Sequence, residues 1–219
     1  SGRTQAKAVG ANPKAKFYSL VNKQKEKDLG YVVFPWEDHQ HDAEDAVARV
    51  IEHIGDDPTR EGLLDTPKRV VKSWNKIYGG YVQNPEDVLK TTFDVTSDEM
   101  IISKNIEFYS TCEHHMQPFF GKASIGYIPK ARVVGLSKLS RLVEVYCRRL
   151  QIQERLTNQI ADGIMNVMNP LGCGVVLEAK HFCMVCRGVE KQNSSMVTSS
   201  IRGLFQNGDV KKEFLQFIK

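Results

Sequence analysis

The sequence predicts an α+β fold in which the long helices cover one face of an antiparallel sheet. Its periodic segments follow the order helix, helix, strand, strand, helix, helix, strand, strand, helix, without the regular alternation of parallel α/β folds. The chain has 219 residues, of which 41% are hydrophobic, so it can bury one core without disulfides. We expect three regions: an extension over residues 1–36, a helical region over 37–99 and a sheet domain over 100–219.

The predicted extension is basic and lacks periodic apolar positions. Residues 1–30 hold seven Lys or Arg and two acids, a net +5, whereas the whole chain carries +4, so the remainder is close to neutral. A polar, basic segment without interleaved aromatic residues is most simply a flexible, solvated arm. We therefore expect no nucleic-acid partner.

The cysteines of this chain are not arranged as a disulfide framework. They are odd in number and scattered, at Cys112, Cys147, Cys173, Cys183 and Cys186. We expect no signal peptide, and no apolar stretch comes close to 18 residues. These observations predict a cytoplasmic protein without a membrane partner, whose cysteines are metal ligands or core residues.

Two helices are predicted before the sheet. Apolar residues recur at helical spacing from Val47 to Ile54, and Gly55 ends this run. The second helix starts where Thr66 can cap it and Pro67 suits the first helical position.

The predicted sheet is built from two pairs of strands. The first pair lies within residues 100–129, which are rich in β-branched and aromatic residues, and the segment TCEHHMQPFF (111–120) connects its two strands. The second pair lies within 174–185 and 194–205. The residues that can carry chemistry are therefore expected on a loop between two strands.

Three further helices complete the pattern. One is expected to start at Ser137, and one covers residues 151–168 until Asn169-Pro170 stops it. A terminal helix follows the last strand, and its predicted apolar face consists of Val210, Phe214, Phe217 and Ile218.

The segment 111–120 places several possible metal ligands together. Cys112 and His115 can chelate one ion, whereas the neighbouring His114 must point elsewhere. In an extended strand His181 and Cys183 share a face, so Cys183 is a candidate for the distant third ligand. Two cysteines and one histidine suit zinc, and three protein ligands leave the fourth position for water, as in catalytic zinc sites.

A closed structural site is the main alternative. Cys112, His115, Cys183 and Cys186 would form it, with no open position for chemistry. Strand alternation turns Cys186 away from Cys183, which counts against this arrangement. We expect Cys186 and Cys173 to be small core residues instead.

An anion site is suggested by the start of the helix at Ser137. Lys138 and Arg141 lie three residues apart beside free helix amides, and Arg187 brings another cation near Cys183. From pattern alone, however, such cations most often form a solvated face, and Glu154 is most simply an exposed helix glutamate.

Three long motifs in order carry a resemblance to a known family. They are STCEHHMQPFFGKASIGYIP, VVGLSKLSRLVEVYCRRLQIQERLTNQIA and EAKHFCMVCRGVEKQNSSMVTSS. From His39 to Lys219 the chain resembles GTP cyclohydrolase I. This implies that 100–219 is a catalytic domain with the tunnelling fold (T-fold), whose sheets pair into an oligomeric barrel, normally a homodecamer of two pentamers with sites shared between subunits.

The resemblance also implies roles for individual residues. The family's zinc (Zn2+) ligands correspond to Cys112, His115 and Cys183. Its proton-transferring histidines correspond to His114 and His181. Substrate-binding roles fall on Gln153 and Glu154 for guanine and on Ser137, Lys138, Arg141 and Arg187 for the triphosphate. Arg69 is a less specific further phosphate contact.

The implied reaction is zinc-dependent hydrolysis of the guanine imidazole ring of GTP. It releases formate and forms 7,8-dihydroneopterin triphosphate, at the start of folate and tetrahydropterin biosynthesis. His114 would protonate the imidazole ring and His181 would move protons on the ribose side. The alternative is a T-fold or zinc-stabilised binding module with a structural metal; a nitrile reductase with the same fold uses a catalytic cysteine without zinc.

Overall fold

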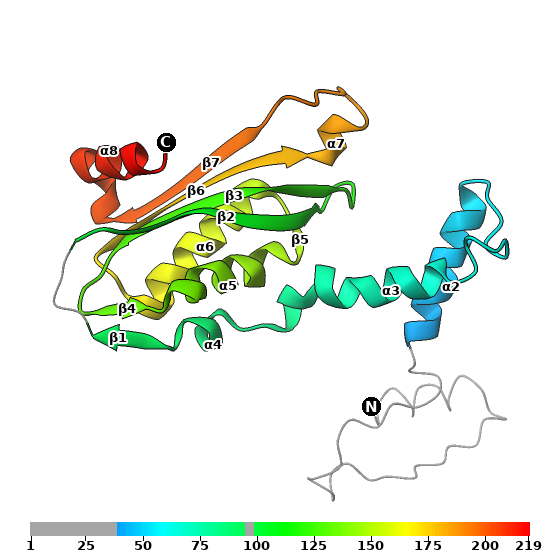
Figure 1. Cartoon of the computed structure of the whole chain (residues 1–219), viewed down its shortest axis with the longest axis horizontal. Coiled ribbons are helices and arrows are strands. Elements are labelled where there is room, and N and C mark those ends of the chain that lie inside the picture. Colours follow the sequence, from blue (N-terminus) through cyan, green and yellow to red (C-terminus); the bar gives the residue numbers. More distant parts are fainter. Residues whose placement is uncertain (1–38, 95–98) are drawn as a thin grey trace, which may run out of the picture.

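The computed structural model describes residues 39–94 and 99–219 of the chain (Figure 1). The expected extension over 1–36 lies outside the described residues. The boundary expected at residue 99 directly follows residues 95–98, which also lie outside the described residues. The division into three regions therefore stays a prediction. None of the helices in the described residues is long and apolar enough to cross a membrane.

The main sheet has five strands in the order β5-β2-β3-β6-β7. The four long strands pair antiparallel as predicted, and they are β2 (Ile101–Cys112), β3 (Pro118–Ile128), β6 (Gly172–His181) and β7 (Met196–Gly203). The two-residue β5 (Leu150–Gln151) pairs parallel with β2, so the sheet is mixed at this edge. A separate pair, β1 (Thr92–Asp94) and β4 (Arg132–Val134), was not predicted.

Two helices cover one face of this sheet, as the sequence predicts. They are α5 (Leu136–Cys147) and α6 (Gln153–Met168), which lie side by side across the strands (Figure 1). Alternate residues of the central strands point toward them, and the core they form includes Phe119, Ala123, Ile125, Tyr127, Val175 and Leu177.

Among the described residues, the opposite face is covered only at one end, by α8 (Gly208–Phe217) after the short helix η3 (Leu204–Gln206). Phe205 and Phe214 are buried there in a smaller core, over the strand positions Gly126 and Gly174. Val210 and Ile218 join this core, but Phe217 is 55% exposed, so its predicted place on the apolar face is wrong.

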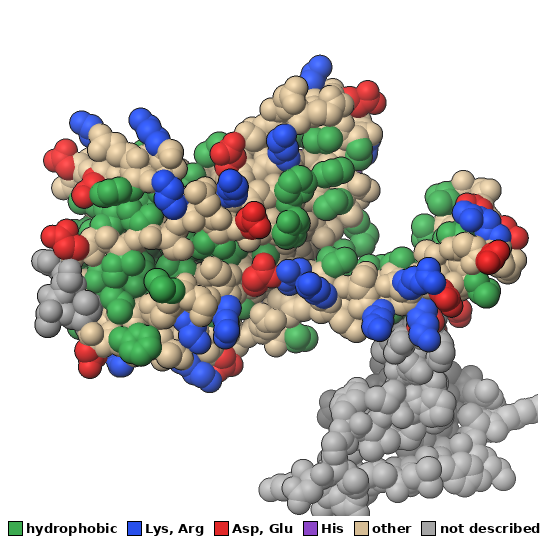
Figure 2. Space-filling model, viewed as in Figure 1, with side chains coloured by type: hydrophobic (Ala, Val, Ile, Leu, Met, Phe, Trp, Pro, Cys, Tyr) green, Lys and Arg blue, Asp and Glu red, His purple; other side chains and the backbone are tan. Residues whose placement is uncertain are grey.

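The rest of that face is open. Tyr109 and Phe120 stack on it with ring centroids 6.0 Å apart, and Tyr109 is 57% exposed. Oppositely charged residues alternate across three paired strands beside these rings, as Glu107, Lys122 and Glu178. Figure 2 shows exposed hydrophobic side chains gathered on the molecule in the region where β3 begins and β6 ends beside α7 (Phe182–Val185).

The first two helices, α2 (His39–His53) and α3 (Thr66–Ile77), project away from the sheet (Figure 1). Pro67 lies in the first turn of α3 as predicted, but Asp65 occupies the cap position and Thr66 is already helical. The 3-10 helix η2 (Gly79–Val82) and α4 (Pro85–Leu89) then lead to the sheet.

Arg149 helps to tie this connection to the sheet domain. Arg149 donates to the carbonyl of Gly80 over 2.8 Å, and its guanidinium lies 5.7 Å from the ring of Tyr81 and 5.3 Å from that of Tyr146. The backbone N–H of Gly80 donates to Arg148. Cation–π contacts and charge-assisted hydrogen bonds therefore hold η2 against the end of α5.

We expect Gly121→Ala to destabilise the sheet. A Cβ at this position would lie 1.8 Å from the carbonyl oxygen of Glu178, so β3 and β6 would have to separate locally. Overpacking of this kind typically costs about 1–3 kcal/mol of unfolding free energy. Guanidinium unfolding followed by circular dichroism measures the change. Gly208→Ala is the control, because its Cβ would meet no atom within 4 Å; equal stability of the two variants would contradict the prediction.

Candidate functional site

Two thiols and one imidazole converge at the end of the sheet. The ligand atoms of Cys112, His115 and Cys183 all lie within 4.8 Å of one another, and Sγ of Cys112 is 3.8 Å from Nδ1 of His115. A tight turn produces this approach: the N–H of Cys112 donates to Gln117, and the N–H of Met116 donates back to Cys112. Met116 adopts a positive φ of 52° to close the turn.

Cys183 reaches the cluster from a helical turn, not from the predicted strand. β6 ends at His181, and residues 182–185 form α7, so the alternation argument for Cys183 and Cys186 is wrong beyond His181. Cys186 is exposed at the end of α7, and its thiol donates to the carbonyl of Phe182. It is therefore not a core residue, whereas the burial predicted for Cys173 is confirmed.

The cluster fits a zinc ion by its donor set and its spacing. Zinc binds thiolate sulfur at about 2.3 Å and imidazole nitrogen at about 2.0–2.1 Å, so the ligand atoms of a tetrahedral site lie roughly 3–4 Å apart. The observed spacing needs only a small adjustment. Burial, followed by the neighbouring Cys112, raises the pKa of the Cys183 thiol, and the charge of Arg187 opposes this effect.

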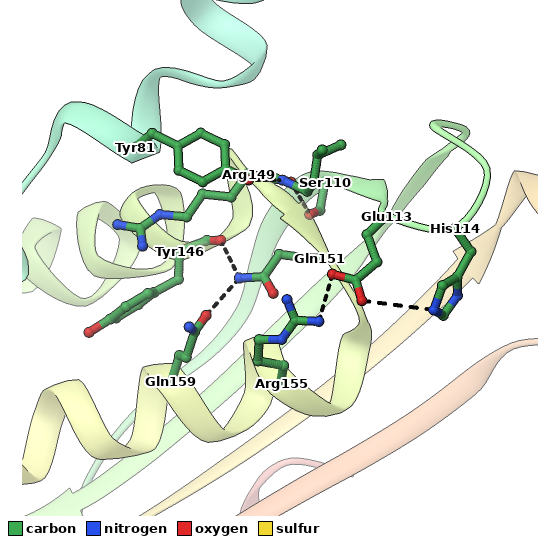
Figure 3. Close-up of polar contacts among 10 residues, drawn as sticks. Tyr81, Ser110, Glu113, His114, Tyr146, Arg149, Gln151, Arg155 and Gln159 are labelled. Atoms are coloured by element: carbon green, nitrogen blue, oxygen red, sulfur yellow. Dashed lines mark hydrogen bonds and ion pairs between the residues drawn. The ribbon is translucent and has the colours of Figure 1, made fainter.

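His114 points away from this cluster and is held by an acid that the sequence analysis did not single out. Its side chain is 64% exposed, and its Nε2 lies 3.8 Å from a carboxylate oxygen of Glu113. The other oxygen of Glu113 accepts a 2.6 Å hydrogen bond from Arg155 (Figure 3). The sequence gives one indication that these two residues belong to the site, which is that Glu113 is adjacent to His114 and Arg155 is adjacent to Glu154.

His181 lies at the same end of the sheet, on the last residue of β6. Its ring stacks on Phe119 with centroids 4.6 Å apart and planes 4° apart, and its Nε2 is 2.8 Å from Oε1 of Gln153. Burial lowers the pKa of His181, and the charge of Glu154 opposes this effect. Glu154 is thus within electrostatic reach of the histidine and is itself exposed at the start of α6.

Gln153 differs from its neighbour Glu154 because its side chain is only 1% exposed. Its amide nitrogen lies within hydrogen-bonding distance of the carbonyls of Leu177 and Met196. The side chain expected to bind guanine is therefore occupied by contacts within the chain.

The predicted phosphate residues divide into two groups in space. Arg187 lies near the cluster, where its charge acts on Cys183. Ser137 and Lys138 lie at the opposite end of α5 and Arg141 lies at its middle, because the segment after the end of this helix pairs with Cys112. At about 1.5 Å per residue, Ser137 is about 15 Å away from that helix end.

Arg69 is also not brought to the cluster by this chain. It lies on the projecting α3, where it forms an exposed 3.1 Å ion pair with Asp65.

The fold and the side chains at the end of its sheet define an α+β protein with a candidate catalytic metal centre. The sequence model of one family, described as GTP cyclohydrolase I, matches residues 43–219. The chain therefore belongs to the GTP cyclohydrolase I family. The T-fold is the fold of this family, and the mixed, mainly antiparallel sheet with two helices on one face agrees with it.

Curated relatives agree with this assignment over nearly their whole length. A protein of Wolinella succinogenes named GTP cyclohydrolase 1 is 60% identical over 84% of this chain and 99% of its own. Proteins with the same name from Chlorobaculum tepidum and Helicobacter pylori strain G27 are 53% and 52% identical. They cover 83% and 77% of this chain, and 85% and 94% of their own.

We expect the cysteines outside the cluster to differ in reactivity. Burial raises the pKa of Cys147 and of Cys173 to about 12, so at pH 8 only about one thiol in 10⁴ would be ionised, whereas Cys186 is exposed. Brief alkylation of the native protein with iodoacetamide should modify Cys186 first, as peptide mass spectrometry would measure. All five should react in guanidinium, and native labelling of Cys147 as fast as Cys186 would refute the expectation.

Proposed function

We propose that this protein is a zinc-dependent hydrolase that opens the imidazole ring of GTP, releases formate and forms 7,8-dihydroneopterin triphosphate. The observation that carries the proposal is the convergence of Cys112, His115 and Cys183 beside two histidines that do not belong to the ligand set. Membership of the GTP cyclohydrolase I family and the names of its curated relatives support the substrate.

The zinc would be held by Cys112, His115 and Cys183. When bound, it supplies a water activated at near-neutral pH for attack on the imidazole carbon of guanine. Cys186 faces Phe182, so among the described residues the group of candidate ligands has three members, as an open catalytic site requires. This arrangement favours the hydrolase over a binding module with a closed, structural metal site.

His114 is the candidate proton donor to the imidazole ring. It is adjacent in sequence to the candidate ligand His115, but the planes of the two rings are 84° apart. Because its side chain is exposed, it is accessible to substrate. Glu113 holds the histidine from the other side and is itself oriented by Arg155. A general acid fixed in this way typically contributes about 10²- to 10⁴-fold to the rate.

Glu154 and His181 are proposed to act on the base and the ribose. A carboxylate at the start of α6 can accept hydrogen bonds from the ring N–H and the exocyclic amine of guanine, which adenine does not present as a pair. Sites that recognise substrate donors in this way can reject analogues by about 10⁴-fold. His181, whose pKa burial lowers, remains available in its neutral form to accept a proton on the ribose side.

The triphosphate site is proposed to form between subunits. Within one chain Ser137 and Lys138 are displaced from the cluster by almost the length of α5 and Arg141 by about half of it, whereas Arg187 is close to the cluster. A second copy can bring its own α5 to this cluster. The open edge of β7 and the uncovered sheet face are features that closing into an oligomeric barrel would remove, consistent with a homodecamer of two pentamers.

Three substitutions test the reaction and the role of the metal. Cys112→Ala should lose both zinc and GTP turnover, because two ligands hold the ion weakly. His114→Ala should keep zinc but lose turnover by about 10²- to 10⁴-fold, because it removes a proton donor and no ligand. Zinc per chain is measured by mass spectrometry, and turnover by pterin fluorescence after oxidation.

The control for these variants is Cys186→Ala, which should keep zinc and activity. Loss of zinc from this variant would favour the closed four-ligand site. Wild-type protein that binds zinc yet forms no pterin from GTP would refute the proposed reaction.

Mixed oligomers test the shared site. Lys138→Ala and His114→Ala should each be nearly inactive, but subunits dissociated, mixed and reassembled should regain activity. Each restored site takes Lys138 from one subunit and His114 from another, so random mixing restores roughly one quarter of the sites. Each variant reassembled alone is the control, and light scattering should give a mass well above a dimer. No recovery in mixed oligomers would place both residues of a site in one chain.

A further inference from the structure

We propose that Gln153 is a positioning residue that holds His181 in the tautomer with its proton on Nε2. The inference deepens the proposed function and rests on it, because that function gives His181 its role in proton transfer. It reassigns the Gln153 side chain, which the family resemblance places on guanine, to the histidine behind the base.

The orientation of the Gln153 amide follows from its surroundings. One end of the amide lies 3.1 Å from the carbonyl oxygen of Leu177 and 2.9 Å from that of Met196. Carbonyl oxygens only accept hydrogen bonds, so the NH₂ group must face them. The flipped amide would place its oxygen against these two carbonyl oxygens at a position that is 1% exposed, where no water can satisfy the unpaired groups.

Two threonine hydroxyls fix the same orientation independently. Oγ1 of Thr157 lies 2.6 Å from the backbone carbonyl of Gln153, so it must donate its single hydrogen there. Thr198, 2.6 Å from Thr157, then has to donate to Thr157. The Thr198 oxygen is thereby left to accept from the amide nitrogen of Gln153, which is 3.1 Å away. The two hydrogens of this amide are then shared among three acceptors, which are this hydroxyl and the carbonyls of Leu177 and Met196.

With the amide nitrogen committed to these partners, its oxygen faces the histidine. Oε1 of Gln153 is 2.8 Å from Nε2 of His181, and an amide oxygen only accepts, so Nε2 carries the proton. In the neutral ring the lone pair is then on Nδ1. The stacked Phe119 fixes the plane of the ring, and Gln153 fixes its rotation and its tautomer.

This assignment separates two neighbouring residues by function. Glu154 is exposed at the start of α6 and is available to the base, whereas Gln153 is buried behind His181. Substitution of Gln153 should therefore slow the step that His181 serves without weakening the binding of GTP.

Kinetics test this separation. Gln153→Met should lower kcat for GTP by about 10- to 100-fold, the usual effect of losing a partner that orients a histidine. In a His181→Ala background the same substitution should change kcat less than about twofold, because the two residues act as one unit. In that slow background the Kd of GTP is measured by calorimetry: Gln153→Met should leave it within about threefold, whereas Glu154→Ala should raise it about tenfold or more.

Two results would overturn the inference. One is a rise in the Kd of GTP with Gln153→Met as large as that with Glu154→Ala. The other is an equal fall in kcat with and without His181. If the circular dichroism spectrum or the oligomer mass of Gln153→Met differs from that of the wild type, Gln153→Asn replaces it in the same measurements and is judged by the same criteria. The Asn amide is one methylene too short to contact His181.

The tautomer can be read without any turnover. Magic-angle-spinning NMR of protein labelled with ¹⁵N-histidine, assigned by comparison with His181→Ala, should show a protonated Nε2. A proton on Nδ1 in the neutral ring would refute the inference even in an active enzyme. A protonated Nε2 in wild-type protein that does not convert GTP would refute the proposed function and leave the positioning contact standing.

Discussion

The register between β2, β3 and β6 is the constraint on which the site depends. Thr111 pairs with Pro118 and Phe119 with His181, so the end of β2, the start of β3 and the end of β6 coincide. A shift of one residue would turn the side chains of a strand to the other face and separate the candidate ligands. Gly121 permits the pairing, because its missing side chain lets β3 lie directly against β6.

The sequence predicts the parts of this arrangement that depend on local pattern. Alternation identifies the long strands, helical spacing identifies α5 and α6, and the spacing of Cys112 and His115 suits a turn between paired strands. The structure brings Cys183 within 4.8 Å of both residues, although through a different local structure from the predicted strand. The turn of α7 has no apolar period long enough to distinguish it from a continuing strand.

Contacts between distant segments were not predictable in the same way. The pairing of Glu113 with Arg155, 42 residues apart, depends on the parallel contact of β5 with β2, and a two-residue strand leaves no pattern. The burial of Gln153 likewise arises because the start of α6 lies against β6 and β7. Sequence motifs identify which residues carry chemistry, whereas tertiary packing decides which of them face substrate and which face one another.

The projecting helices differ from the sheet in how their structure is maintained. Among the described residues α3 has no buried side chain, and its link to the sheet runs through η2 and the Arg149 contacts with Gly80 and Tyr81. Within one chain, α2 and α3 therefore form a separate cooperative unit that can open while the sheet stays folded. Their amide hydrogens would exchange through this local opening, whereas those of β3, hydrogen-bonded on both sides, would exchange only when the whole chain unfolds.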